Sequence, residues 1–121
     1  YNLLYTNDSV PQITNYAMLL TEQQAPEKGI SVLQKLSKVI KEYNSDCNLD
    51  YATVQETLGI IYLMTANLPQ AKIHFKRAFK IYEKIWGDEP EMIEKKYQEI
   101  QELYPQVGFF LGQQISTFLM K

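Results

Sequence analysis

The sequence has few of the residues on which enzyme chemistry depends. Its 121 residues include one cysteine, Cys47, and one histidine, His74. A single cysteine cannot form an internal disulfide, and these two distant residues cannot supply the ligands of a zinc site. The five glycines are scattered, so no phosphate-binding glycine loop can be built from them. We therefore expect no enzyme activity and no metal or other cofactor, and the free thiol favours a reducing, cytoplasmic location.

Long apolar runs and an excess of positive charge are also missing. No apolar run approaches the ~20 residues that a helix needs to cross a bilayer. With 12 Lys+Arg against 14 Asp+Glu, the formal net charge is -2, which lacks the basic excess typical of nucleic-acid-binding domains. We expect neither a membrane nor nucleic acid as a partner. The 45% hydrophobic and 21% charged composition is that of an ordinary globular protein.

Helical periodicity is the main pattern that the sequence does contain. Apolar residues recur at spacings of three and four through nearly the whole chain, whereas strict alternation is hard to find. All five prolines fall between periodic segments, where a missing N–H is harmless in the first turn of a helix. These patterns predict an all-α protein in which six helices pair as three hairpins. The expected helices span residues 10–24, 27–44, 51–66, 69–86, 90–103 and 106–120.

The segment 69–86 predicts a helix with two distinct faces. One face carries small and aromatic residues and is expected to pack: Ala71, Phe75, Ala78, Phe79 and Tyr82. The other carries lysines at steps of four residues: Lys72, Lys76, Lys80 and Lys84. We expect this basic ridge to be a solvated outer surface, although such a ridge could also meet phosphate or an acidic peptide. His74 is expected at the exposed edge of the helix, and Gly87 is expected to end it with a left-handed backbone.

The chain also repeats with a period of 42 residues. A shift of this length places Ala17 on Gly59 and Gly29 on Ala71, so small residues fall on small ones. Small residues are needed where the two helices of a hairpin approach closely. The shift also places the first residues on the end of the helix at 27–44, so we interpret the chain as a piece of a longer array. The expected divisions are the end of an upstream helix at 1–8, repeats at 9–48 and 49–89, and a degenerate repeat or cap at 90–121.

The second repeat resembles the tetratricopeptide repeat family. The signature residues are Leu58, Gly59 and Tyr62, followed by Ala71, Phe75 and Ala78. The run from Ala78 to Pro90 is similar to the longer kinesin-light-chain variety, in which Ala-x-x-Ile-Tyr-Glu-Lys precedes a glycine and an acidic-proline turn. The resemblance implies an α-solenoid of antiparallel helical hairpins, ending in a C-terminal capping helix, that binds a protein or peptide.

The resemblance also implies a binding site. Family members line a concave groove with equivalent positions from the first helix of each hairpin. Here those positions are Thr14, Met18, Thr21 and Glu22, then Glu56, Ile60, Leu63 and Met64. Chaperone-binding members hold a terminal carboxylate with a set of asparagine and basic residues. At the equivalent positions of this chain only Asn15 and Lys95 fit, so the set is incomplete. We therefore do not expect binding to a chaperone tail.

Three functions are compatible with these features. The leading one is an interaction module, a scaffold or adaptor that holds a partner in a concave groove. The second is the peptide-sensing C-terminal part of a bacterial transcription regulator, whose DNA-binding helix-turn-helix would lie upstream. The third is an accessory domain of a larger enzyme, in which the repeats themselves are not catalytic. Fold alone does not separate these functions, and the sequence fixes neither the partner nor the oligomeric state.

Overall fold

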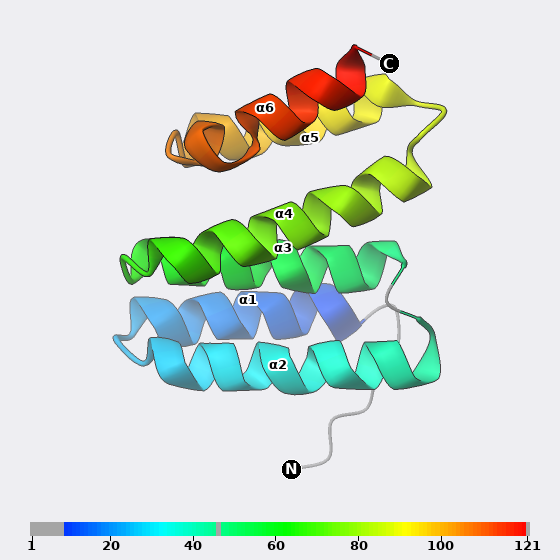
Figure 1. Cartoon of the computed structure of the whole chain (residues 1–121). Helices are drawn as coiled ribbons and strands as arrows, with labels where there is room; N and C mark the ends of the chain where they lie inside the picture. The colour runs from blue at the N-terminus through cyan, green and yellow to red at the C-terminus, as the bar shows by residue number, and fades with distance from the viewer. Residues whose placement is uncertain (1–8, 46, 121) are drawn as a thin grey trace.

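A computed structural model describes residues 9–45 and 47–120, and over this part of the chain it contains six α-helices and no strand. The helices are α1 (Ser9–Glu22), α2 (Pro26–Tyr43), α3 (Leu49–Met64), α4 (Leu68–Ile85), α5 (Pro90–Leu103) and α6 (Val107–Leu119). Consecutive helices form three antiparallel hairpins that lie one above another (Figure 1). The expected all-α helical-repeat fold is confirmed. The helix end predicted at 1–8 lies outside the described residues.

Each of the first two hairpins has a glycine where its two helices approach closely. A Cβ atom added to Gly29 of α2 would lie 2.6 Å from the backbone oxygen of Ala17 in α1. A Cβ added to Gly59 of α3 would lie 2.9 Å from the ring of Phe75 in α4. In the first hairpin the glycine is on the second helix, and in the second hairpin it is on the first helix. Ala71 of α4, which lies 42 positions after Gly29, is fully buried. Both hairpins therefore leave no room for a side chain at the glycine, which is on α2 in the first hairpin and on α3 in the second.

The turns inside these two hairpins share one geometry. Gln24 and Ala66, which are 42 residues apart (66 − 24), have φ angles of 65° and 61°. The residue after each donates its N–H to the carbonyl five positions earlier, from Ala25 to Leu20 and from Asn67 to Tyr62, both at 2.8 Å. This pattern is the Schellman motif, which usually has glycine at the left-handed position. Both turns therefore carry side chains where the backbone favours none.

The end of α4 differs from the expectation for Gly87. Over the described part of the chain no glycine has a positive φ, so the predicted left-handed glycine is wrong. The Trp86 N–H instead donates to the Tyr82 carbonyl at 2.7 Å. The Trp86 ring stacks on the Tyr82 ring with centroids 4.8 Å apart. Aromatic packing at this helix end thus takes the place of a glycine turn.

The third hairpin is attached differently from the second. α3 lies against both α1 and α2, but no Cα atom of α5 comes within 8 Å of one in α3, both helices being described in full. The hairpin instead reaches α4, mainly through α6. The Phe110 ring of α6 stacks on Phe75 at 6.4 Å, and the Gln114 amide donates to the Glu83 carboxylate at 2.7 Å. α5 and α6 form the top layer of Figure 1, above α4.

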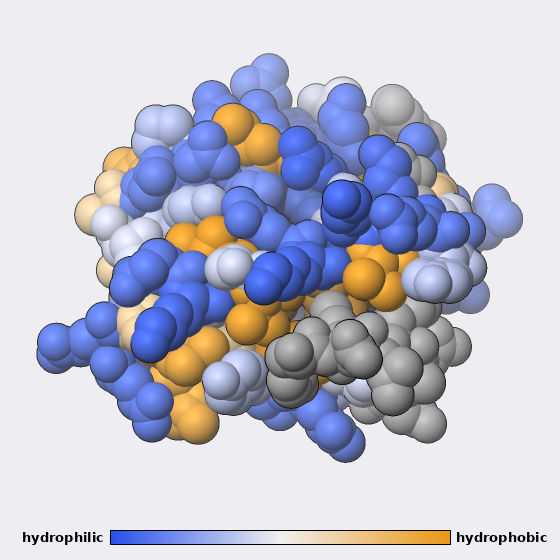
Figure 2. All heavy atoms as spheres, turned by 90° about the horizontal axis from the view of Figure 1, so that it is seen from below, coloured by the Kyte–Doolittle hydropathy of each residue, from blue (hydrophilic) through white to orange (hydrophobic). Residues whose placement is uncertain are grey.

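The two ends of the stack have different surfaces. α2 forms the lower end in Figure 1, and its exposed residues include Lys28, Lys35 and Lys38. Figure 2 views the molecule from that end, where hydrophilic side chains cover most of the surface and hydrophobic ones emerge in patches between them. At the other end, Phe109 of α6 and Met120 just beyond it are 90% and 86% exposed. A capping helix normally turns a polar face outward, so this end is more apolar than a cap requires.

Candidate interaction surface

α3 is the central helix, and its open surface forms one narrow stripe. Its neighbours α1, α2 and α4 bury most of its length. From Tyr51 to Met64, six residues of α3 are half-buried or exposed. One is Tyr62, and the other five form the stripe: Thr53, Glu56, Ile60, Leu63 and Met64. Their spacing of three and four residues puts them on one side of the helix. All four positions that the resemblance assigns to α3 lie on this stripe.

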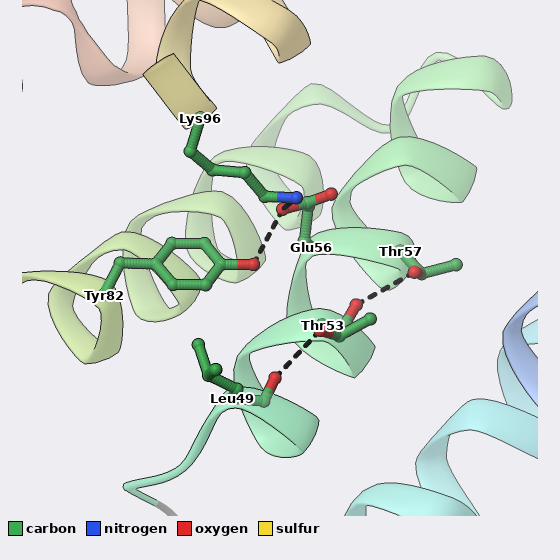
Figure 3. Close-up of polar contacts among 6 residues, drawn as sticks. All are labelled: Leu49, Thr53, Glu56, Thr57, Tyr82 and Lys96. Carbon is green, nitrogen blue, oxygen red and sulfur yellow. Dashed lines mark hydrogen bonds and ion pairs between the residues drawn. The ribbon is translucent and has the colours of Figure 1, made fainter. Parts of the chain in front are cut away.

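A polar cluster centred on Glu56 occupies one end of the stripe. Glu56 Oε1 accepts a hydrogen bond from the Tyr82 hydroxyl at 2.8 Å and forms an ion pair with Lys96 Nζ at 3.1 Å (Figure 3). The cluster therefore joins α3, α4 and α5. Burial, the nearby Glu56 charge and the hydrogen bond to it raise the pKa of the Tyr82 hydroxyl well above its usual value. The phenol accordingly remains a donor to Glu56 over the ordinary pH range.

The hydroxyls of the two threonines beside Glu56 donate hydrogen bonds to backbone carbonyls of α3. Thr53 donates to the Leu49 carbonyl at 2.8 Å, and Thr57 donates to the Thr53 carbonyl at 2.9 Å (Figure 3). Bonds of this type are common for threonine within helices. The rest of the stripe is its apolar end, where Met64 is 45% exposed.

The equivalent positions of α1 are less accessible. Thr14 and Thr21 are only 7% and 9% exposed. Their hydroxyls donate to the carbonyls of Pro11 and Ala17 at 3.0 and 2.9 Å. Met18 is half-buried, and Glu22 is exposed. In α1, contact surface is thus available at Met18 and Glu22 rather than at the threonines.

A second polar cluster, which the sequence did not predict, is buried between α2, α3 and α4. Gln55 is 1% exposed, and its amide nitrogen donates to the Ser37 hydroxyl at 3.1 Å. Its amide oxygen accepts a hydrogen bond from Arg77 at 3.2 Å and lies 2.7 Å from His74 Nδ1. Arginine can only donate, so the oxygen must face it, and His74 must then present an N–H at Nδ1. The cluster ties three helices together through one glutamine.

His74 is therefore buried, and the expected exposed position is wrong. Its side chain is 8% exposed, and its ring stacks on Tyr62 with centroids 5.4 Å apart. Burial, helped by the neighbouring Arg77 charge, lowers the pKa of His74 to about 4. The ring is thus neutral at physiological pH, and its Nδ1–H donates to the Gln55 amide oxygen. This histidine stabilises the helix packing and offers little surface to a partner.

Other kinds of site find no support in the part of the chain that is described. Over residues 9–45 and 47–120, no group of three or more His, Cys, Asp or Glu side chains lies close enough to hold a metal ion. None of the helices described is both long and apolar enough for a bilayer crossing. The stripe on α3 is therefore the surface on which the sequence-based expectation and the geometry can be compared.

Comparison with known proteins gives one family. The tetratricopeptide repeat model matches residues 9–84, which is more than half of the chain and covers α1 to α4 almost completely. α5 and α6, which depart from the packing of the first two hairpins, lie outside the match. No curated protein and no solved structure matches the chain. From the match and the hairpin geometry together, the chain belongs to the tetratricopeptide repeat family.

Proposed function

We propose that this chain binds a segment of another protein on the stripe of α3 and the adjoining accessible residues of α1. Tetratricopeptide repeats generally mediate protein–protein interaction, which supports the class of partner. The observation that carries the proposal is the apolar end of the stripe. Ile60 and Leu63 keep exposed surface, and Met64 is 45% exposed, although all three lie on the central helix.

The chemistry of the stripe suggests how a partner would be held. Binding energy concentrates in a few central apolar contacts, and methionine adapts its shape to the side chains it meets. We assign Ile60, Leu63 and Met64 as anchors on α3, with Met18 and Glu22 contributing from α1. Thr14 and Thr21 are buried, and their hydroxyls are hydrogen-bonded within α1, so we assign them a structural role rather than contact with the partner. Glu56 orients Lys96 at the polar end of the site.

Two further features belong to the same proposal. The 42-residue spacing of the left-handed turns at Gln24 and Ala66 supports repeats of the longer, kinesin-light-chain-like kind. We also propose that the module acts in the cytoplasm and by binding alone, without catalysis. The exposed, unpaired thiol of Cys47 suits a reducing compartment.

The test compares two methionines of similar chemistry. Met64→Glu should remove the partners that the wild-type chain captures from a lysate, because a carboxylate would be placed at the centre of the apolar contact. Met120→Glu, at an 86% exposed residue directly after α6, is the matched control and should retain them. Circular dichroism should show that both variants fold. Capture of the same proteins by Met64→Glu and wild type would refute the proposed site.

A further inference from the structure

The basic ridge of α4 forms one wall of an open groove. Its four lysines, Lys72, Lys76, Lys80 and Lys84, line a space of about 830 Å³ between α4 and α6. The opposite wall includes Phe109, Phe110 and Phe118 of α6. The sequence pattern predicts a solvated ridge that could also meet phosphate or an acidic peptide. It does not predict the aromatic wall, because α6 lies more than twenty residues away along the chain. The packing of α6 on α4 is what places aromatic side chains opposite the lysines.

The charge on this wall is unbalanced. None of the four lysines forms an ion pair with any residue that the structure describes. The one carboxylate lining the groove, Glu83, is engaged by the Gln114 amide at 2.7 Å. On the far side of α4, a second hollow of about 440 Å³ shares Lys80 and Lys84 and adds Lys41 and Arg77. In a chain of net charge -2, positive charge is therefore concentrated on the α4 side of the molecule.

The aromatic wall provides an apolar surface beside these charges. Phe109 is 90% exposed, which is unusual for so large an apolar side chain, and Phe118 is half-buried. Phe110 is anchored because its ring stacks on the fully buried Phe75 at 6.4 Å. The wall is thus a fixed part of the fold with one phenylalanine projecting from it. A ligand that contacts both walls must combine negative charge with apolar side chains.

We propose that the α4–α6 groove binds an acidic amphipathic helix of a partner protein. Lysines at four-residue steps recur every ~6 Å and span about 18 Å of α4. Carboxylates four residues apart on a helix lying along α4 have the same spacing, and the apolar face of that helix would contact Phe109 and Phe118. Nucleic acid is less suited, because the wall opposite the lysines carries no lysine or arginine. This surface is separate from the stripe of α3 and does not depend on the function proposed above.

The experiment uses a defined probe, a labelled peptide of about 14 residues that forms a helix about 20 Å long. Glutamates occupy one face of the peptide and leucines the other. Fluorescence anisotropy should detect binding that weakens with added salt, and a version with glutamine in place of glutamate should not bind. The triple variant Lys72→Glu, Lys76→Glu, Lys80→Glu should weaken binding by about tenfold or more. The matched variant Lys28→Glu, Lys35→Glu, Lys38→Glu on α2 changes the net charge equally and should stay within about twofold of wild type.

Three further variants distinguish binding in the groove from loss of folding and from binding at the α3 site. Phe109→Ser alters a 90% exposed side chain, so the fold should persist while binding weakens by about fivefold. Tyr43→Ser, at an 80% exposed residue of α2, is the control and should bind as wild type does. Met64→Glu should also bind the acidic peptide normally. Loss of acidic-peptide binding in Met64→Glu would place the peptide on the α3 stripe and overturn the groove.

Other results would overturn the proposal as well. Equal losses in the two lysine triples would mean that only net charge matters. Binding of oligouridylate or of phosphatidylserine vesicles in place of the peptide would assign the lysines to a different anionic ligand. In another outcome, the chain fails to bind the peptide but associates with itself, and the Lys72, Lys76 and Lys80 reversals abolish that association. This result would assign the groove to a second copy of the chain. The predicted pattern is peptide binding that both Phe109→Ser and the α4 triple weaken.

Discussion

The two junctions between hairpins are built in different ways. At the first, α3 lies against both helices of the preceding hairpin, and the buried Gln55 adds a hydrogen bond to Ser37 across the contact. At the second, α5 stays clear of α3 at the backbone level, both being described throughout. The third hairpin approaches α4 instead, mainly through α6. The side-chain contacts across this junction are the Glu56–Lys96 ion pair, the Gln114–Glu83 hydrogen bond and the Phe110–Phe75 ring contact.

The difference shows how a regular repeat array acquires an individual surface. The family match ends at residue 84, within α4, so the regular junction lies inside it and the irregular one outside. Because α6 approaches α4 in its own way, the lysines of α4 face phenylalanines rather than solvent alone. Continued regular stacking would have given α5 the place against α3 that α3 has against α1. The irregular junction therefore creates the α4–α6 groove.

The largest expected effect tests whether close helix approach is confined to the first two hairpins. Gly29→Leu should destabilise the fold by about 3 kcal/mol, because even its Cβ would meet the Ala17 backbone oxygen at 2.6 Å. Gly112→Ala in α6 should instead stabilise by about 0.5–1 kcal/mol, since its Cβ meets only the Tyr97 hydroxyl at 3.6 Å. Urea unfolding of both variants measures the contrast. Similar losses in the two would show that the third hairpin is packed as tightly as the first.

Acid should destabilise the fold through His74, which packs against α3 within the second hairpin and bonds to the same Gln55 that crosses the first junction. The usual pKa of the ring is 6.5 and its folded value is about 4, so between these values the unfolded chain binds a proton that the folded chain does not. Stability should therefore fall as the pH drops from 6.5 to 4, by at most about 1.4 kcal/mol per pH unit, and this histidine should have no effect above 6.5. His74→Phe should lack this component of the pH slope in thermal unfolding. An unchanged slope in that variant would mean that other groups cause it.

Sequence patterns identified the elements of this fold but not their tertiary relations. Helix positions and the small pairs at Ala17 and Gly59 follow from periodicity and proline placement, which are local signals. The burial of His74 depends on Gln55, nineteen residues earlier on another helix, and no local pattern reports such a partner. The left-handed turns at Gln24 and Ala66 were missed because neither contains the expected glycine.

The candidate site was likewise predicted only in part from the sequence. The resemblance gave the spacing that places Ile60 and Met64 on the open side of α3. It could not show that Thr14 and Thr21 are covered, since accessibility depends on how neighbouring helices pack. The meeting of α6 with the lysines of α4 depends on a junction outside the recognised repeats, so no repeat pattern could have predicted it.

The second junction should be the easier of the two to weaken locally. Glu56→Gln removes the charge that pairs with Lys96, while its amide oxygen can still accept from Tyr82, so we expect a loss of about 1 kcal/mol. Hydrogen exchange should quicken in α5 and α6 more than in α1 and α2. Glu42→Gln at an exposed position of α2 is the control and should leave exchange unchanged. Uniform quickening across all six helices would show that the third hairpin does not open separately.

The smallest effect concerns the turns, which the first two hairpins share and the third lacks. Ala66 has a φ of 61°, a conformation that costs a residue with a side chain roughly 1–2 kcal/mol. Glycine removes this strain but gives the unfolded chain more freedom, so Ala66→Gly should stabilise by only about 0.5 kcal/mol. Gln24→Gly should have the same effect at the equivalent turn. Ala25→Gly, where φ is -124°, relieves no strain and should destabilise slightly, and thermal unfolding of the three variants measures the difference. A gain in all three would contradict the assignment of strain to the left-handed residues, whereas a gain in the first two alone would show that both hairpins close through the same strained turn.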